Sequence, residues 1–175
     1  ERGYLLPVDA NPDTPETNGF SVDLLYENLA KLETGSGTVF LDACFSGNSP
    51  KGMIIRATSG ISIEPRFPET DSEMIVITAA QGDQYASWAE EAKFGLFTRY
   101  LLEGLRGAAD GEDYGNGDNK VTLGEVKKYL DDGMTYAAKR AFGGEQDATV
   151  LGDQGLVLAS YRPRPAPDKP KIPSA

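Results

Sequence analysis

The hydrophobic pattern of this chain predicts several strands. Residues 38–43 and 73–80 are short apolar runs rich in β-branched side chains, which is typical of buried parallel strands. Shorter apolar runs at residues 4–9, 149–151 and 155–159 predict further strand segments.

Other segments have the spacing of helices. In residues 22–32 the apolar side chains recur every three or four positions, and Ser21 before them is a suitable N-cap. Residues 94–105 repeat this pattern, and Thr122 with Glu125 has the spacing of a capping box ahead of another helix. The stripe of the first helix consists of Val22, Leu25, Leu29 and Leu32. Alternating strands and helices predict an α/β architecture with a mainly parallel sheet.

The segments between and after these elements predict one domain with a long loop and a C-terminal tail. Residues 48–72 carry Gly, Pro and Ser without clear periodicity, and they predict a long loop of the kind that is usually functional or disordered. A proline-rich tail is expected over 161–175, after one domain over 1–160. Because core-like structure is expected within a few residues of the start, we interpret the chain as a fragment of a longer protein.

Composition and charge exclude several classes of function. A chain of 175 residues with 39% hydrophobic side chains suits one globular domain, and no apolar run approaches the length of a membrane span. The net charge of −10 argues against a nucleic-acid or anionic-membrane binder. With one cysteine and no histidine, the chain forms no intrachain disulfide and is a poor candidate for structural zinc. Any chemistry that needs histidine must take its imidazole from outside these residues.

The candidate reactive side chain is Cys44. A lone cysteine is more often a small buried apolar residue, but this one follows a predicted strand and precedes the small residues Ser46 and Gly47. Ligands of α/β sheets bind beyond the carboxyl ends of strands, which is where Cys44 is expected. A phosphatase loop does not fit, because Pro50 stands where its arginine belongs. A G-x-C-x-G elbow does not fit either, because Asp42 takes a glycine position.

The segment Leu41-Asp42-Ala43-Cys44-Phe45-Ser46-Gly47 resembles the nucleophile segment of caspase-like cysteine peptidases, specifically the metacaspases and their prokaryotic relatives. Residues 3–9, 77–105 and 117–129 are similar to further segments of that family, so the resemblance covers roughly residues 1–160. It implies a caspase–haemoglobinase-like α/β fold whose N-terminal strands are missing from this chain. The resemblance divides this domain into three parts. Residues 1–48 would be the end of the large-subunit part, residues 49–72 an intersubunit-type loop, and residues 73–160 the small-subunit part.

The resemblance also implies a cysteine endopeptidase that acts on protein or peptide substrates. Cys44 matches the nucleophile of a Cys–His dyad, and the histidine is expected on an upstream segment. The implied partner is therefore an N-terminal fragment of the same protein, without which the chain is expected to be inactive. Ser87 matches a residue that pairs with the substrate backbone, and Trp88 one that walls a substrate pocket; an ordinary core indole is an equal alternative for Trp88.

The side chains at two positions of the implied substrate pocket predict which P1 residue the peptidase prefers. Asp42 and Ala89 stand where caspases carry the Gln and Arg that help to bind an acidic P1 residue. Losing a cation and gaining a carboxylate favours a P1 arginine or lysine instead. Lys51, Arg56 and Arg66 are then candidate autocleavage sites of a zymogen, although these cations could simply solubilise the loop.

Two other functions are weighed against a peptidase. The acidic loop before Glu125 resembles an EF-hand, but Tyr114 and Asn119 occupy two of its defining positions, which favours a structural turn. No metal and no cofactor is therefore expected. A non-catalytic caspase-fold interaction module remains the main alternative, with residues 110–132 as its candidate surface. A cytoplasmic protein that binds neither nucleic acid nor membrane is expected.

Overall fold

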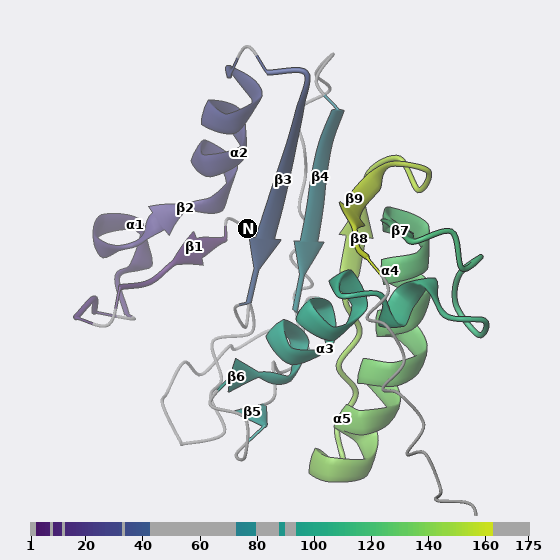
Figure 1. The fold of residues 1–175 in the computed structure, drawn as a ribbon. Helices are drawn as coiled ribbons and strands as arrows, with labels where there is room; N and C mark the ends of the chain where they lie inside the picture. The colour runs from purple at the N-terminus through teal and green to yellow at the C-terminus, as the bar shows by residue number, and fades with distance from the viewer. Residues whose placement is uncertain are drawn as a thin grey trace, which may run out of the picture.

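The computed structural model describes residues 3–7, 9–11, 13–32, 34–42, 73–79, 88–89 and 94–162. Its central feature is a three-stranded sheet with the strand order β3-β4-β8 (Figure 1). Strand β3 (Ser36–Leu41) runs parallel to β4 (Glu73–Thr78), and β8 (Thr149–Leu151) is antiparallel to β4. The predicted α/β class is confirmed, with a sheet that contains both kinds of pairing.

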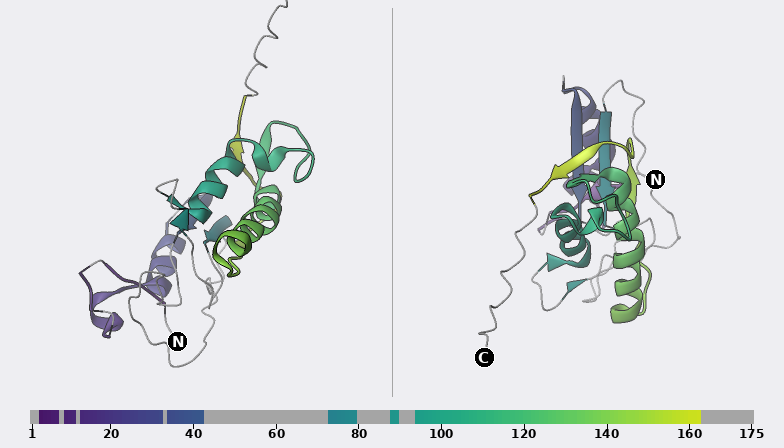
Figure 2. Two further views of the ribbon diagram at one scale, coloured as in Figure 1. Left: turned by 90° about the horizontal axis from the view of Figure 1, so that it is seen from below. Right: turned by 45° about the vertical axis from the view of Figure 1, so that its right-hand side comes forward.

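Helices cover both faces of this sheet. On one face, Val22 and Tyr26 of α2 (Val22–Ala30) pack with Val76 of β4. On the other face, Ile75 and Ile77 of β4 join the larger core, to which α3 (Leu96–Leu105) contributes. The views of Figures 1 and 2 accordingly place α2 on the opposite side of the sheet from α5. Because neighbouring residues of β4 point to opposite faces, one short apolar strand serves both cores.

A long helical segment forms much of the larger core. It consists of α4 (Leu123–Tyr129), a π-helical turn η2 (Leu130–Met134) and α5 (Thr135–Phe142). Its start is fixed by the predicted capping box, in which Thr122 Oγ1 accepts from the Glu125 N–H at 3.3 Å and Glu125 Oε2 accepts from the Thr122 N–H at 2.8 Å. It ends at Gly143, which has a φ of 71°, in the left-handed region that glycine adopts without strain.

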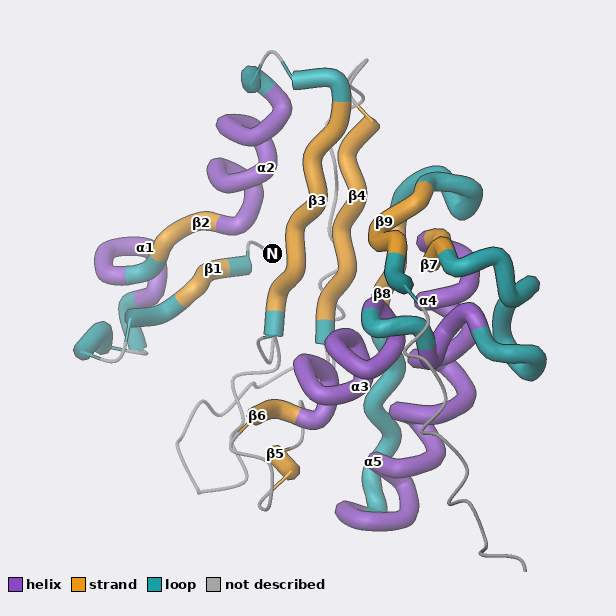
Figure 3. The backbone as a smooth tube through the Cα atoms, viewed as in Figure 1, coloured by secondary structure: helices purple, strands orange, loops and turns teal. Residues whose placement is uncertain are grey.

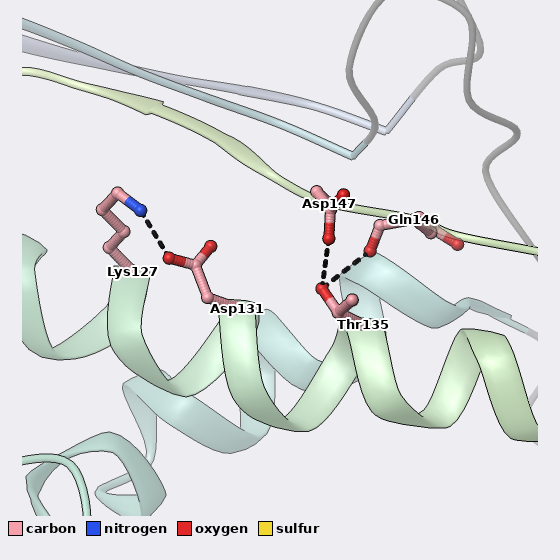
Figure 4. A network of polar contacts seen from close by, with 5 residues as sticks. All are labelled: Lys127, Asp131, Thr135, Gln146 and Asp147. Carbon is pink, nitrogen blue, oxygen red and sulfur yellow. Dashed lines mark hydrogen bonds and ion pairs between the residues drawn. The ribbon is translucent and has the colours of Figure 1, made fainter.

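Polar contacts tie this helical segment to the chain that leads into β8. Thr135 Oγ1 donates to Asp147 Oδ1 at 2.7 Å and to the carbonyl of Gln146 at 3.1 Å (Figure 4). Lys127 and Asp131, earlier on the same helical segment, form a partly exposed ion pair on the side of the helix that carries Thr135 (Figure 4). The Thr135 contacts therefore orient the segment around Gln146 relative to the helix.

Three antiparallel two-stranded pairs complete the described fold. They pair β1 (Tyr4–Leu5) with β2 (Phe20–Ser21), β5 (Trp88–Ala89) with β6 (Phe94–Gly95), and β7 (Lys120–Thr122) with β9 (Val157–Ser160). Two short helices are α1 (Pro15–Asn18) and the 3-10 helix η1 (Ala108–Asp110). Figure 3 shows that these pairs surround the central sheet without joining it.

Several local predictions are confirmed and others are wrong. Ser21 caps α2, because its hydroxyl accepts from the Leu24 N–H at 3.4 Å. Leu32 lies beyond the end of that helix and is 54% exposed, so it does not extend the apolar stripe. Strand β3 is not buried as expected, since Phe40 is 44% exposed. Residues 94–95 form β6 instead of the first helical turn, because they pair with β5.

None of the helices in the described part of the chain is long and apolar enough to cross a membrane.

Candidate functional site

The parallel pairing of β3 and β4 brings their carboxyl ends to one edge of the sheet, facing β6 and the start of α3 (Figures 1 and 3). The pairing continues one residue further, since the Ala79 N–H donates to the carbonyl of Leu41 at 2.9 Å. Ala79 is buried, whereas Asp42 is exposed. Asp42 therefore lies just beyond the carboxyl end of β3, where α/β sheets bind ligands.

The carboxylate of Asp42 contacts the first turn of α3. Thr98, which lies 56 positions later in the sequence, donates its hydroxyl to Asp42 Oδ2. Gly95 is the N-cap residue of α3, and a Cβ atom added there would lie 2.5 Å from the same oxygen. Since the N-terminal end of a helix favours negative charge, α3 provides a suitable environment for this carboxylate.

The β5–β6 pair lies directly beside Asp42. Trp88 is the register partner of Gly95, and Ala89 is the partner of Phe94. The backbone of Trp88 is thereby held one strand away from the glycine that contacts Asp42. Of the positions that the sequence singled out, Trp88 and Ala89 therefore pair with the strand whose Gly95 lies against Asp42.

Other predicted site residues lie outside the described residues. They are Cys44, Ser87, Lys51, Arg56 and Arg66. In the sequence, Cys44 follows Asp42 by two positions and Ser87 immediately precedes Trp88.

A buried glutamine stabilises the carboxyl ends of β3 and β4. Gln146 is fully buried, and its Nε2 donates to the carbonyl of Ala79 at 2.9 Å. Ala79 is therefore held on both sides, by Leu41 through its N–H and by Gln146 through its carbonyl. Because a buried carbonyl without a donor is costly, Gln146 stabilises the strand ends from which Asp42 emerges.

The acidic loop is organised around Asp110, which is 1% exposed. Its Oδ1 accepts from the N–H groups of Gly117 at 2.7 Å and Asp118 at 3.2 Å, and its Oδ2 accepts from the Asn119 N–H at 2.8 Å and the Tyr161 hydroxyl at 2.9 Å. Burial by itself raises the pKa of Asp110, but these hydrogen bonds outweigh it and lower the pKa below its ordinary value. Both carboxylate oxygens are therefore used to hold the loop.

Asp118 and Glu125 also accept hydrogen bonds from the backbone of this segment. Asp118 Oδ1 accepts from the Lys120 N–H at 2.9 Å, and Glu125 completes the capping box. Among the residues that the structure describes, no three or more Asp, Glu, Cys or His side chains are grouped so that they could hold a metal ion. These contacts favour the structural turn over the EF-hand interpretation.

Sequence reasoning assigned no role to Thr98 or Gly95, and it missed Gln146 entirely. A threonine in the first turn of a helix and a glycine at its N-cap are common, so neither residue type identifies a contact with Asp42. A buried glutamine in a polar segment is equally hard to recognise, because its partner is a backbone carbonyl 67 positions away.

Comparison with known proteins gives one family. The sequence profile described as peptidase C14, caspase domain, matches residues 1–148 of this chain. No match to the chain was found among curated proteins or among solved structures.

Proposed function

Because this chain belongs to the caspase-domain family of cysteine peptidases, we propose that it is the nucleophile-bearing part of an endopeptidase that cleaves protein or peptide substrates after Arg or Lys. The observation that carries this proposal is the exposed carboxylate of Asp42, at the carboxyl edge of the sheet and two positions before the one cysteine. Within the family, we propose that the chain belongs with the metacaspases.

The proposed reaction uses Cys44 as the nucleophile. Its thiolate attacks the carbonyl carbon of the scissile bond and forms a C–S bond, while an imidazolium protonates the leaving amine as the C–N bond breaks. Water then hydrolyses the thioester, which releases the carboxylate product and returns the thiol. The backbone N–H of Cys44 is proposed as one donor to the oxyanion that forms in between.

The imidazole is proposed to come from an N-terminal segment of the same protein. The 175 residues contain no histidine, so a Cys–His dyad requires a partner from outside them. The fold offers a place for that partner, because β3 forms one edge of the central sheet among the described strands. An open strand edge carries unpaired N–H and C=O groups that can bind another strand.

Asp42 is proposed to bind the P1 cation. A guanidinium or ammonium group gains a charge-assisted hydrogen bond from a carboxylate, whereas a P1 aspartate would be repelled by it. Ser87 and Trp88 are proposed to contact the substrate beside P1. The position of β5 next to Gly95 supports a role for this segment at the same pocket.

Activation is proposed to involve self-cleavage of a zymogen. Lys51, Arg56 and Arg66 lie in the 49–72 segment, between the proposed large-subunit part (1–48) and small-subunit part (73–160), and each offers the basic P1 residue that the proposed pocket selects. Residues 161–175 are proposed to be a proline-rich tail. A cytoplasmic location fits this proposal, because a catalytic thiol remains reduced there.

Substrate profiling of the full-length protein tests the proposal. We expect a peptide library to be cleaved after Arg and Lys, and Asp42→Asn to lower kcat/KM on Arg substrates by about thirty-fold or more, the loss typical of removing one partner of a charge pair. Asp113→Asn is the matched control, since it removes the same charge from an exposed position on the acidic loop. Cleavage after Asp, or full Arg cleavage by Asp42→Asn, would contradict the specificity. An inert protein with an unreactive Cys44 would favour the interaction module.

A further inference from the structure

We propose that Thr98 is a positioning residue for substrate recognition, and that it fixes the direction of the Asp42 carboxylate together with Gly95. This inference rests on the proposed function, because it assigns the P1 cation to Asp42. It adds two residues on a different element, α3, that sequence reasoning gave no role.

The hydrogen bond is directed at one oxygen of Asp42. Thr98 Oγ1 donates to Oδ2, and among the described residues no other donor contacts this carboxylate. An ionised carboxylate accepts about four hydrogen bonds over its two oxygens. The contact with Thr98 therefore orients the side chain through Oδ2, while Oδ1 accepts from no donor of the described residues and is proposed to bind a cation of the substrate.

Gly95 also lies close to this carboxylate. A Cβ atom at this position would lie 2.5 Å from Oδ2 and 3.1 Å from both Cγ and Oδ1 of Asp42. The backbone of Gly95 has a φ of −59° and a ψ of 152°, which any residue adopts. The position requires glycine because Asp42 occupies the space, and not because of its backbone conformation.

An exposed aspartate that turned freely would have to be ordered each time a substrate binds, and that ordering lowers affinity. The hydroxyl of Thr98 and the close approach of Gly95 order Asp42 in advance. Since α3 is anchored in the core by Phe97 and Leu101, the two contacts tie the P1-binding group to a helix that is packed into the core.

The β5–β6 pair stands directly before α3 in the chain. The pairing of Trp88 with Gly95 fixes the backbone just before the helix, and Gly95 must lie close to Asp42 for Thr98 to reach it. The same small sheet therefore places the proposed substrate-contacting segment and the contact that orients Asp42.

Steady-state kinetics on the full-length protein with a P1-Arg peptide test the inference. We expect Thr98→Val, which keeps the side-chain shape and removes the hydroxyl, to lower kcat/KM about ten-fold, mainly through KM, as for a lost hydrogen bond to a charged group. Thr98→Ser should return kcat/KM to within about two-fold of the wild type, because the donor is restored. Alkylation of Cys44 by iodoacetamide should keep its wild-type rate in both variants, since that reaction does not use the pocket.

Two further variants separate orientation from stability. Gly95→Ala should lower kcat/KM in the same way as Thr98→Val, because its Cβ displaces the carboxylate. Tyr161→Phe is the matched control, as it removes another hydroxyl-to-carboxylate bond, to Asp110 of the acidic loop, and keeps the aromatic ring. It should leave KM for the P1-Arg peptide unchanged. In the Asp42→Asn background, Thr98→Val should cause no additional loss.

The outcomes distinguish this inference from the proposed function. A wild-type protein that does not cleave after Arg or Lys would overturn the proposed function, and the role of Thr98 with it. A wild type that cleaves after Arg, with Thr98→Val and Gly95→Ala both at wild-type KM, would overturn the positioning role alone. Equal losses in Thr98→Val and Thr98→Ser would also overturn it, because packing and not the hydroxyl would then be responsible.

Discussion

The hydroxyl of Tyr161 donates to Asp110 Oδ2 at 2.9 Å, although 51 positions separate the two residues. The ring of Tyr161 also packs against Gly107, where an added Cβ atom would lie 2.6 Å from the ring. The residue that follows β9 is thereby joined to the start of the acidic loop. This contact helps to define the conformation of the loop, because backbone N–H groups and one tyrosine hydroxyl donate to the Asp110 carboxylate.

The lowered pKa of Asp110 predicts an acid-dependent loss of stability. Because the folded state binds a proton on Asp110 less readily than the unfolded state does, this carboxylate stabilises the fold above its ordinary pKa of 3.8. That contribution is lost as the pH falls through the lower pKa of the folded protein. We expect Asp110→Asn to be less stable at pH 7 and to lose less stability on acidification than the wild type.

Urea unfolding between pH 7 and pH 2 measures this effect. Asp113→Asn serves as the control, since Asp113 is exposed and should leave the pH dependence close to that of the wild type. Identical pH dependence in Asp110→Asn and the wild type would show that the hydrogen bonds to Asp110 do not stabilise the charged carboxylate.

The acidic loop is predicted not to bind calcium. Its carboxylates already accept hydrogen bonds from the loop backbone, so a calcium ion would have to displace the donors of Gly117 and Asn119. We expect millimolar calcium to leave the amide NMR signals of these two residues unchanged. Saturable shifts at these amides would instead support the EF-hand interpretation.

Gln146 is predicted to be important for stability. Gln146→Leu keeps most of the side-chain volume and leaves the buried carbonyl of Ala79 without this donor, so we expect a loss of about 1–3 kcal/mol in the free energy of unfolding. Gln154→Leu is the matched control: its Nε2 donates to the carbonyl of Gly152 at 3.2 Å, but on the surface, and should change stability by less than about 0.5 kcal/mol. Equal effects of the two substitutions in urea unfolding would contradict the role of Gln146.

The isolated chain is predicted to be inactive. A thiol with a pKa near 8.5 is only a few per cent thiolate at neutral pH, and these residues hold no imidazole to protonate the leaving amine. We expect hydrolysis of a P1-Arg fluorogenic peptide to appear when the upstream segment is co-expressed with residues 1–175. An active 175-residue monomer on its own would rule out the proposed Cys–His partnership.

Local sequence signals predicted much of the fold. The capping box at Thr122 and the N-cap at Ser21 were correct because a capping hydrogen bond involves neighbours in sequence. The exposure of Phe40 was not predictable from the apolar run that contains it, because burial of a strand depends on what packs against each face. The final strand region was divided between two sheets, since β8 pairs with β4 and β9 with β7, and pairing partners are not encoded locally.

The candidate site likewise contains some residues that the sequence identified and others that only the structure revealed. Asp42, Trp88 and Ala89 were found through a resemblance of sequence motifs, and in the structure Trp88 and Ala89 pair with the strand whose Gly95 lies against Asp42. Thr98 and Gly95 were assigned no role because their contact with Asp42 exists only after α3 has packed against the strand ends. A sequence shows which residues can perform chemistry more readily than which residues hold them in place.

The central claim is that Cys44 attacks substrates that present a basic P1 residue. Its most direct test is mass spectrometry of the full-length protein after treatment with a peptidyl-arginine acyloxymethyl ketone, which forms a thioether only with an activated thiol. We predict one adduct, located on Cys44, that excess P1-Arg peptide prevents and that Cys44→Ala abolishes together with all peptide hydrolysis. An unmodified Cys44, or hydrolysis that persists in Cys44→Ala, would contradict the account.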